Sequence, residues 1–234
     1  MSKSRKRTKV IGRPEAILFD WDNTIIQSAH VYDQILVAIA KQLNLDEGFF
    51  LSDVFQANKH LSLRCMLPRV FGSRWQEVES IHNEQVAKRY LDQVVLMPHV
   101  EEFLSALLDD GIVMSIVSNK EGDRVRHEVD KLGFGKYFYN IVGAGDAVTD
   151  KPAADPVYLA LAGVKERNLY DHTVWFIGDS NIDMKCAYDL GCLPILFGNH
   201  KEEIVKVAKQ GIKYTPASDF KSLLNFYTQV KLKK

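Results

Sequence analysis

Short apolar runs alternate with helical segments through most of the chain beyond residue 95. The apolar runs are IVMSIVS at 112–118, YNIVG at 139–143, TVWFIG at 173–178 and LPILFG at 193–198. Between and after them, helical spacing occupies residues 121–132, 156–163, 181–190, 201–210 and 219–230. Strands that alternate with helices at this interval predict βαβ units and a parallel sheet covered on both faces. With AILFD at 16–20 the sheet has five expected strands, so the predicted fold is α/β, with a Rossmann-like, doubly wound parallel core.

Residues 28–94 interrupt this alternation. AHVYDQILVAIAKQL and RWQEVESIHNEQVAKRYLDQVV both have helical spacing, and no strand pattern lies between them. The segment MPHVEEFLSALLDDG then returns the chain to the core as a helix that begins near Pro98 and stops at Gly111. We therefore expect a core of residues 16–27 and 95–234 and an inserted α-helical cap domain of residues 28–94.

Composition excludes several classes of protein. The 234 residues are 46% hydrophobic, and 30 basic side chains balance 30 acidic ones, so no overall field favours nucleic acid or an anionic membrane. Five basic residues fall within residues 1–9, and residues 1–15 are expected to form a disordered, solvated tail. No apolar stretch approaches the roughly eighteen residues of a membrane span. Three cysteines without CxxC spacing suggest neither a disulfide framework nor a zinc site, which fits a cytoplasmic protein.

Polar side chains gather at the ends of the expected strands. The first strand is followed by Asp20 and Asp22, the second ends in Ser118 and Asn119, and the fourth is followed by Asp179 and, a helical turn later, Asp183. Lys151 stands in the Gly-rich loop before the helix that Asp155 and Pro156 open. In an open parallel sheet, ligands bind beyond the carboxyl ends of the strands. We therefore expect all of these side chains to meet in one site.

Four carboxylates at one edge would repel each other and raise each other's pKa unless a cation lay among them. Carboxylate oxygens with water and a strand-end carbonyl suit Mg²⁺. A lysine and several hydrogen-bond donors beside the acids describe a site for a doubly negative phosphate group. Each of these short patterns is common by itself, and their placement at the same end of different strands carries the prediction.

With these residues in this order, the chain resembles the haloacid dehalogenase superfamily. The resemblance is to its branch of small magnesium-dependent phosphatases similar to phosphoglycolate phosphatase. The family motifs occur in order: FDWDNT, VSN, DKP and GDSNID. The resemblance extends over residues 16–198 and leaves the basic tail outside. It implies a soluble phosphatase that acts on a small phosphorylated metabolite with Mg²⁺ as cofactor.

The resemblance also implies a role for each acidic residue of the motifs. Asp20 is expected to be the nucleophile, forming an aspartyl-phosphate that water hydrolyses. Asp22 is expected to serve as general acid and then general base, with its backbone carbonyl on the metal. Asp20 and Asp179 would bind Mg²⁺ directly. Asp183 would hold a metal-bound water or Lys151.

The remaining motif residues are expected to handle the phosphoryl group. Lys151 would offset negative charge on the nucleophile and the phosphate. Ser118 and Asn119 would hold phosphoryl oxygens or the loop around them, and Thr24 would support the motif turn beside the phosphate.

Three positions depart from the family pattern. Asn23 and His99 stand where glycine is common, and Ala154 stands where proline is common. Asparagine tolerates the positive φ that a glycine at position 23 would serve. None of the three touches an implied catalytic role.

The cap is expected to close over the site, excluding water and selecting the substrate. Within it, HLSLRCMLPRVFG at 60–72 is the expected specificity segment, with Arg64 as the preferred substrate contact and His60 as the second. An equally good interpretation is that Arg64 is simply a solvent-exposed residue of a helix.

Other activities stay open at this stage. A haloacid dehalogenase proper needs neither a second aspartate nor magnesium, so Asp22 argues against it. A sugar-phosphate mutase would share the entire core. A phosphonoacetaldehyde hydrolase would use a cap lysine such as Lys59 as a Schiff base. A non-catalytic binding module, docking nucleic acid through the basic tail, is disfavoured by the intact motif residues.

Overall fold

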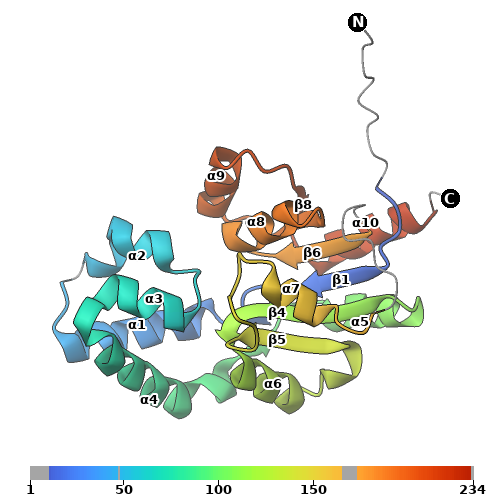
Figure 1. Ribbon diagram of the computed structural model, residues 1–234. Helices are drawn as coiled ribbons and strands as arrows, with labels where there is room; N and C mark the ends of the chain where they lie inside the picture. The colour runs from blue at the N-terminus through green and yellow to red at the C-terminus, as the bar shows by residue number, and fades with distance from the viewer. Residues whose placement is uncertain (1–10, 47, 165–172, 233–234) are drawn as a thin grey trace, which may run out of the picture.

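A computed structural model describes residues 11–46, 48–164 and 173–232 of the chain (Figure 1). Most of the basic segment at residues 1–15 lies outside the described residues. Among the helices that are described, none has both the length and the apolar character needed to cross a membrane.

A six-stranded parallel sheet forms the centre of the fold, in the order β5-β4-β1-β6-β7-β8. Its strands are β1 (Ala16–Phe19), β4 (Val113–Glu121), β5 (Asn140–Ala144), β6 (Val174–Gly178), β7 (Leu193–Phe197) and β8 (Thr215–Ala217). All four residues of β1 are buried, because the strand is central in the sheet and apolar cores cover both of its faces. The five expected strands are present, and β8 is an additional edge strand. Its three residues include a proline and are too short to give a periodic signal.

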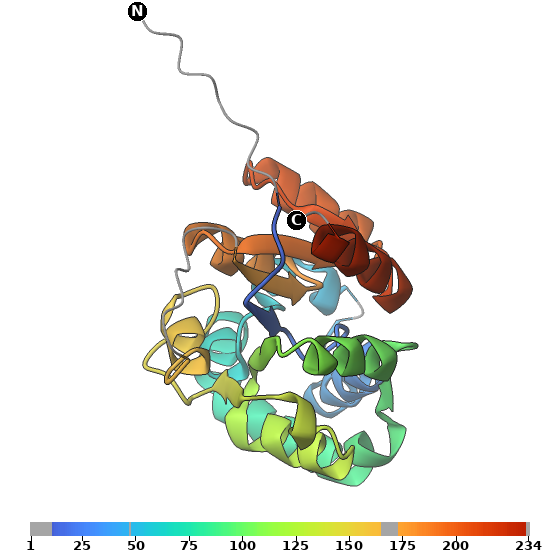
Figure 2. The same ribbon diagram turned by 90° about the vertical axis from the view of Figure 1, so that its right-hand side faces the viewer.

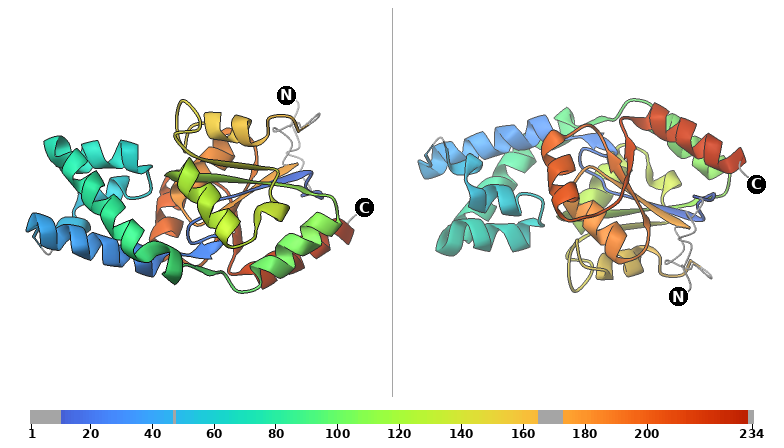
Figure 3. Two further views of the ribbon diagram at one scale, coloured as in Figure 1. Left: turned by 90° about the horizontal axis from the view of Figure 1, so that it is seen from below. Right: turned by 90° about the horizontal axis from the view of Figure 1, so that it is seen from above.

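Helices cover both faces of the sheet (Figure 3). One face packs against α5 (Val100–Asp109), α6 (Gly122–Lys131) and α10 (Phe220–Leu232). The other packs against α7 (Asp155–Ala160) and α8 (Asn181–Asp189), and α9 (Lys201–Lys209) lies beside α8.

Aromatic packing joins α5 to α10, the last helix of the chain. Figure 2 shows α5, in green, next to α10, in dark red. The ring of Phe103 on α5 contacts Phe220 and Tyr227 of α10 at centroid distances of 5.6 and 6.5 Å. Burial of these rings closes the core on this face of the sheet.

A helical insert lies beyond the end of the sheet, on the left of Figure 1. It consists of α1 (Ala29–Leu43), α2 (Asp53–Asn58), α3 (Leu63–Phe71) and α4 (Trp75–Gln93), with short 3-10 turns at Phe49–Leu51 and Gly72–Arg74. A separate apolar core inside the insert combines side chains of α1, α3 and α4. The two longer helices match the expected ones, whereas α2 and α3 are too short to be separated by periodicity alone.

A two-stranded antiparallel ribbon joins the insert to the sheet. It pairs β2 (Ile26–Gln27) with β3 (Val95–Leu96). The sequence did not predict this ribbon, because two residues cannot show alternation. The chain therefore leaves and re-enters the core through adjacent segments, which sets the insert over the carboxyl end of β1.

Candidate active site

Asp20 lies where the central strand of the sheet ends. Its backbone N–H donates to the carbonyl of Ile177 at 2.9 Å, so the ladder between β1 and β6 continues one residue past the strand. The side chain is buried. Strands β4 and β6 flank β1 on opposite sides, which makes this the crevice where open α/β sheets bind ligands.

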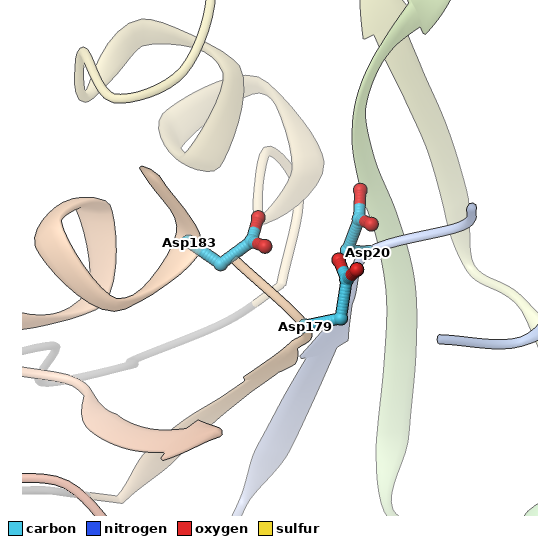
Figure 4. Close-up of side chains that lie close together, drawn as sticks. All are labelled: Asp20, Asp179 and Asp183. Carbon is cyan, nitrogen blue, oxygen red and sulfur yellow. The ribbon is translucent and has the colours of Figure 1, made fainter. Parts of the chain in front are cut away.

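Three carboxylates converge here. Asp20, Asp179 and Asp183 each offer an oxygen, and these oxygens lie within 4.8 Å of one another (Figure 4). Asp179 follows β6 directly, and Asp183 lies in the first turn of α8, where it forms a capping box with Ser180. Gly178 makes room for this packing, because a Cβ at that position would lie 2.4 Å from Cγ of Asp183.

Lys151 is the cation inside this cluster. Its Nζ donates to Asp20 at 2.7 Å and to Asp183 at 2.6 Å, and its side chain is 2% exposed. Despite burial, the charges of Asp183 and Asp20 hold the pKa of Lys151 above its usual value. Lys151 is therefore a permanent ammonium group in the site.

One ammonium group does not balance three carboxylates. Burial raises the pKa of Asp20 to about 7, with Lys151 opposing this shift and Asp183 adding to it. Burial and the charges of Asp20 and Asp183 also raise the pKa of Asp179 well above its usual value. Buried carboxylate oxygens whose negative charge is not fully balanced are the ligands that a hard divalent cation prefers. The residues present thus fit Mg²⁺.

Asp22 points into a different network. Its Oδ1 accepts from Nζ of Lys120 at 2.7 Å, and the same Nζ donates to Glu128 at 2.8 Å. Trp21 donates its ring N–H to Glu128 at 2.6 Å. Asp22 is thereby held apart from the three-carboxylate cluster while still lining the same cavity.

Sequence reasoning missed Lys120 and Glu128. A signal for Glu128 was present, because it falls on the apolar face of its helix, between the buried Val125 and Val129. A charged residue on a buried face needs a partner, and Glu128 has Lys120 and Trp21. The identity of those partners could not be read from the spacing.

Ser118 and Asn119 lie inside β4, which runs on to Glu121, so the strand continues past the two residues at which we expected it to end. The Ser118 hydroxyl accepts from the backbone N–H of Lys120 at 3.1 Å and lines the cavity. Asn119 also lines the cavity, and its amide donates to the backbone carbonyls of His60 and Lys151 at 2.9 and 3.1 Å. Asn119 thus ties the helical insert to the lysine loop.

The turn after β1 needs an unusual backbone conformation. Asn23 has φ of +55°, and its side-chain oxygen accepts from the backbone N–H of Ala29 at 2.9 Å. The prediction that asparagine accommodates a positive φ here is confirmed. His99, the other residue in a glycine position, has φ of +63°. Thr24 is fully buried in the turn, does not line the cavity, and its hydroxyl has no partner among the described residues.

A cavity of about 470 Å³ opens over these groups, between the sheet and the helical insert. Its floor is made of the strand-end residues, and its roof comes from α1, α2, α4 and the segment 50–63. Such volumes enclose small-molecule ligands.

The comparisons with known proteins agree with this arrangement. Residues 17–196 match the family model described as haloacid dehalogenase-like hydrolase. The chain belongs to this family. The prediction of a haloacid dehalogenase superfamily hydrolase is thus confirmed.

Relatives of the hydrolase include proteins named phosphoglycolate phosphatase. That of Pectobacterium atrosepticum is 26% identical over 216 residues, covering 89% of this chain and 91% of the relative. That of Escherichia coli K12 is 30% identical over 127 residues, about half of each chain. A solved superfamily hydrolase from Ehrlichia chaffeensis is 28% identical, has a TM-score of 0.62, and matches 94% of this chain and 98% of its own. A hydrolase from Pseudomonas syringae, 16% identical with a TM-score of 0.76 over 92% and 99% of the two chains, shares the fold.

Arg64 of the hydrolase does not point into the cavity. Its guanidinium binds Asp150 in a bidentate pair at 2.5 and 2.6 Å, and it is absent from the cavity lining. The Ser62 hydroxyl donates to the same carboxylate at 2.5 Å. The expected substrate contact is therefore replaced by an ion pair between the insert and the residue next to Lys151. His60, the second candidate, does line the cavity and pairs with Glu203 of α9 at 3.0 Å.

This ion pair changes the expected result of truncating Arg64. Arg64→Ala should lower kcat/KM by about three- to tenfold on every phosphate ester alike, because a bidentate pair that joins insert and core is lost. Steady-state kinetics on an alkyl and an aryl phosphate would measure this. Arg74→Ala is the matched control, since Arg74 pairs with Glu77 inside the insert only. A loss confined to esters with a second anionic group would instead restore Arg64 as a substrate contact.

Proposed function

We propose that this hydrolase is a Mg²⁺-dependent phosphatase that cleaves a small phosphomonoester through an aspartyl-phosphate on Asp20. The observation that carries the proposal is the placement of Asp20, which is buried at the strand end with Lys151 on one oxygen, while a second carboxylate two residues later faces the same cavity. A nucleophile and a proton carrier so close in sequence suit two-step phosphoryl transfer.

In the first step, a carboxylate oxygen of Asp20 attacks phosphorus and the ester P–O bond breaks. Asp22 gives its proton to the departing alcohol oxygen. In the second step, Asp22 takes a proton from water, whose oxygen attacks the same phosphorus and displaces Asp20. Inorganic phosphate leaves, and both carboxylates return to their starting states. Ser118 is proposed to donate to a phosphoryl oxygen, Asn119 to hold the loop that carries Lys151, and Thr24 to support the turn that carries both aspartates.

Asp20, Asp179, Asp183 and the backbone carbonyl of Asp22 are proposed to hold Mg²⁺, which when bound supplies positive charge to the phosphoryl oxygens. Lys151 keeps its ammonium between Asp20 and Asp183, where it orients the nucleophile. The helical insert is proposed to act as a cap that excludes water from the site.

The proposed substrate is a small phosphorylated metabolite, which the name phosphoglycolate phosphatase of the relatives supports. We further propose that the enzyme acts in the cytoplasm, and its three free cysteines, two of them buried, support a reducing compartment.

Release of inorganic phosphate from p-nitrophenyl phosphate and a panel of alkyl phosphates, with Mg²⁺ and after chelation, tests the proposal. Phosphate release that requires Mg²⁺ is expected. No release from any ester would favour a binding module. Transfer of the phosphoryl group between sugar phosphates without release to water would favour a mutase.

The Schiff-base alternative has little support in the structure. Lys59 lines the cavity, but its Nζ faces the carboxylate of Glu202 at 3.5 Å.

Mg²⁺ binding should depend on pH. Because the pKa of Asp20 is about 7 before a cation binds, the ion must displace a proton below that pH. The apparent affinity for Mg²⁺ should rise by at least about tenfold per pH unit below pH 7, because Asp179, whose pKa is also raised, must lose its proton as well. Calorimetric titration at pH 6 in buffers of different ionisation enthalpy would detect the released proton.

The raised pKa of Asp20 also makes the stability of the fold depend on pH. A carboxyl group whose pKa rises from 3.8 to about 7 on folding stabilises the fold below pH 3.8, and this contribution is lost as pH rises through 7. The increase in melting temperature caused by Mg²⁺ should therefore be larger at pH 8 than at pH 5. An affinity that stays constant between pH 5 and 8 would argue against Asp20 as a ligand.

A further inference from the structure

We propose that the alcohol released by this enzyme is uncharged and carries an aromatic or other apolar ring, and is not a short carboxylate-bearing alcohol such as glycolate. This inference rests on the proposed phosphatase function and concerns the part of the substrate that the strand-end residues do not touch. It follows from what lines the rest of the cavity.

Much of the roof of the cavity is apolar. The apolar lining side chains of the helical insert include Ile35, Leu36, Phe50, Leu51, Phe55 and Leu63. Leu51, which lines the cavity, is 78% exposed, so most of this apolar side chain is not covered by other protein groups. A leaving group with a ring would cover this surface, whereas a two-carbon acid would leave most of a cavity of about 470 Å³ to water.

Aromatic rings stiffen this wall. Phe50 packs edge-on against Phe55 at a centroid distance of 4.9 Å and against Phe49 at 5.3 Å. Phe49 in turn stacks on Phe71, which does not line the cavity. The wall that faces the substrate is therefore a preorganised aromatic surface, which suits another ring better than a carboxylate.

The basic groups on the sheet side of the cavity are already paired. Lys151 binds Asp20 and Asp183, and Lys120 binds Asp22 and Glu128. Through these pairs, both lysines serve the reacting centre.

The basic groups nearer the insert have partners as well. Lys59 faces Glu202 at 3.5 Å, His60 binds Glu203 at 3.0 Å, and Arg124 lies 3.7 Å from Glu121 and donates to Asn83. Burial and the charge of Arg124 lower the pKa of His82 to about 4, so this lining histidine is neutral at pH 7. Every basic side chain among the described lining residues is thus paired with an acid or neutral.

Two lining acids make a second anion still less favourable. Asp33 and Glu121 both line the cavity and are exposed. A substrate carboxylate would meet these like charges and would have to displace an existing acid from a cation. Tyr32 and Gln56, two neutral polar residues of the insert that line the cavity, can hydrogen-bond to an uncharged substituent.

The test compares three primary alkyl phosphates with Mg²⁺: benzyl phosphate, phosphoglycolate and methyl phosphate. All three release an unactivated alcohol, so the comparison does not reward a better leaving group. We expect kcat/KM for benzyl phosphate to exceed that for phosphoglycolate by about tenfold or more. Equal values or a preference for phosphoglycolate would overturn the inference.

Matched variants locate the preference. Leu51→Ala should reduce the benzyl-to-methyl ratio of kcat/KM by about threefold or more, and because Leu51 is exposed its truncation leaves the insert folded. Val54→Ala, a truncation of a neighbouring exposed residue outside the lining, should leave the ratio unchanged. Phe50→Ala, a second lining variant, should lower the ratio in the same way. A ratio that survives both lining variants would overturn the inference.

Failure of this inference is distinguishable from failure of the proposed function. If methyl phosphate and p-nitrophenyl phosphate are hydrolysed without a preference for benzyl phosphate, the phosphatase proposal stands and the inference falls. If no ester is hydrolysed, both fall.

Discussion

Replacing Asp20 with asparagine should abolish turnover, lowering kcat by about 10⁴-fold or more on every phosphate ester. The amide has nearly the same shape and can still accept from Lys151, but its oxygen does not attack phosphorus. Steady-state kinetics would measure the loss. Mass spectrometry of acid-quenched enzyme should find a phosphorylated Asp20 peptide in the natural protein and none in the variant.

The control for this substitution is Asp33→Asn, which removes a carboxylate from the same cavity but outside the three-carboxylate cluster. We expect it to change kcat by less than about threefold, as for an exposed charge. Melting temperatures should show that Asp20→Asn remains folded, since the substitution removes a buried charge. Appreciable turnover by a folded Asp20→Asn protein would show that another group is the nucleophile.

Removing the carboxylate of Asp22 should produce a loss that depends on the leaving group. Asp22→Ala is expected to lower kcat/KM by about 10²- to 10⁴-fold on alkyl phosphates, the usual cost of losing a general acid and base. The loss should be much smaller on p-nitrophenyl phosphate, because a phenolate of low pKa leaves without a proton. The ratio of the two losses is the measurement.

Lys120→Met is the informative companion to this variant. It keeps the Asp22 carboxylate but removes the ammonium that holds it at 2.7 Å. We expect a loss in the same direction and of smaller size, again greater on alkyl than on aryl esters. Equal losses of Asp22→Ala on both classes of ester would mean that Asp22 has a structural or metal-binding role and does not transfer the proton.

The sheet and the cluster of acids around Lys151 were predictable from sequence, because both follow from local patterns. Each apolar run of the core predicts a strand from its own residues alone. Parallel strands then place their carboxyl ends at one edge of the sheet. Asp20, Asp179 and Lys151 each stand within a few residues of such an end, so their convergence follows from the topology. The family motifs then supplied the expected chemistry.

What the tertiary structure decided concerns pairs that are distant in the chain. The sequence suggests that Arg64 is available to bind substrate, whereas in the structure it binds Asp150, 86 residues away. Glu128 and Asp22 share Lys120 only because α6 packs under the turn after β1. No periodicity or motif specifies which acid meets which base, because that choice depends on how the helical insert sits on the sheet. The pairing of the charged side chains that line the cavity is therefore a property of the folded chain.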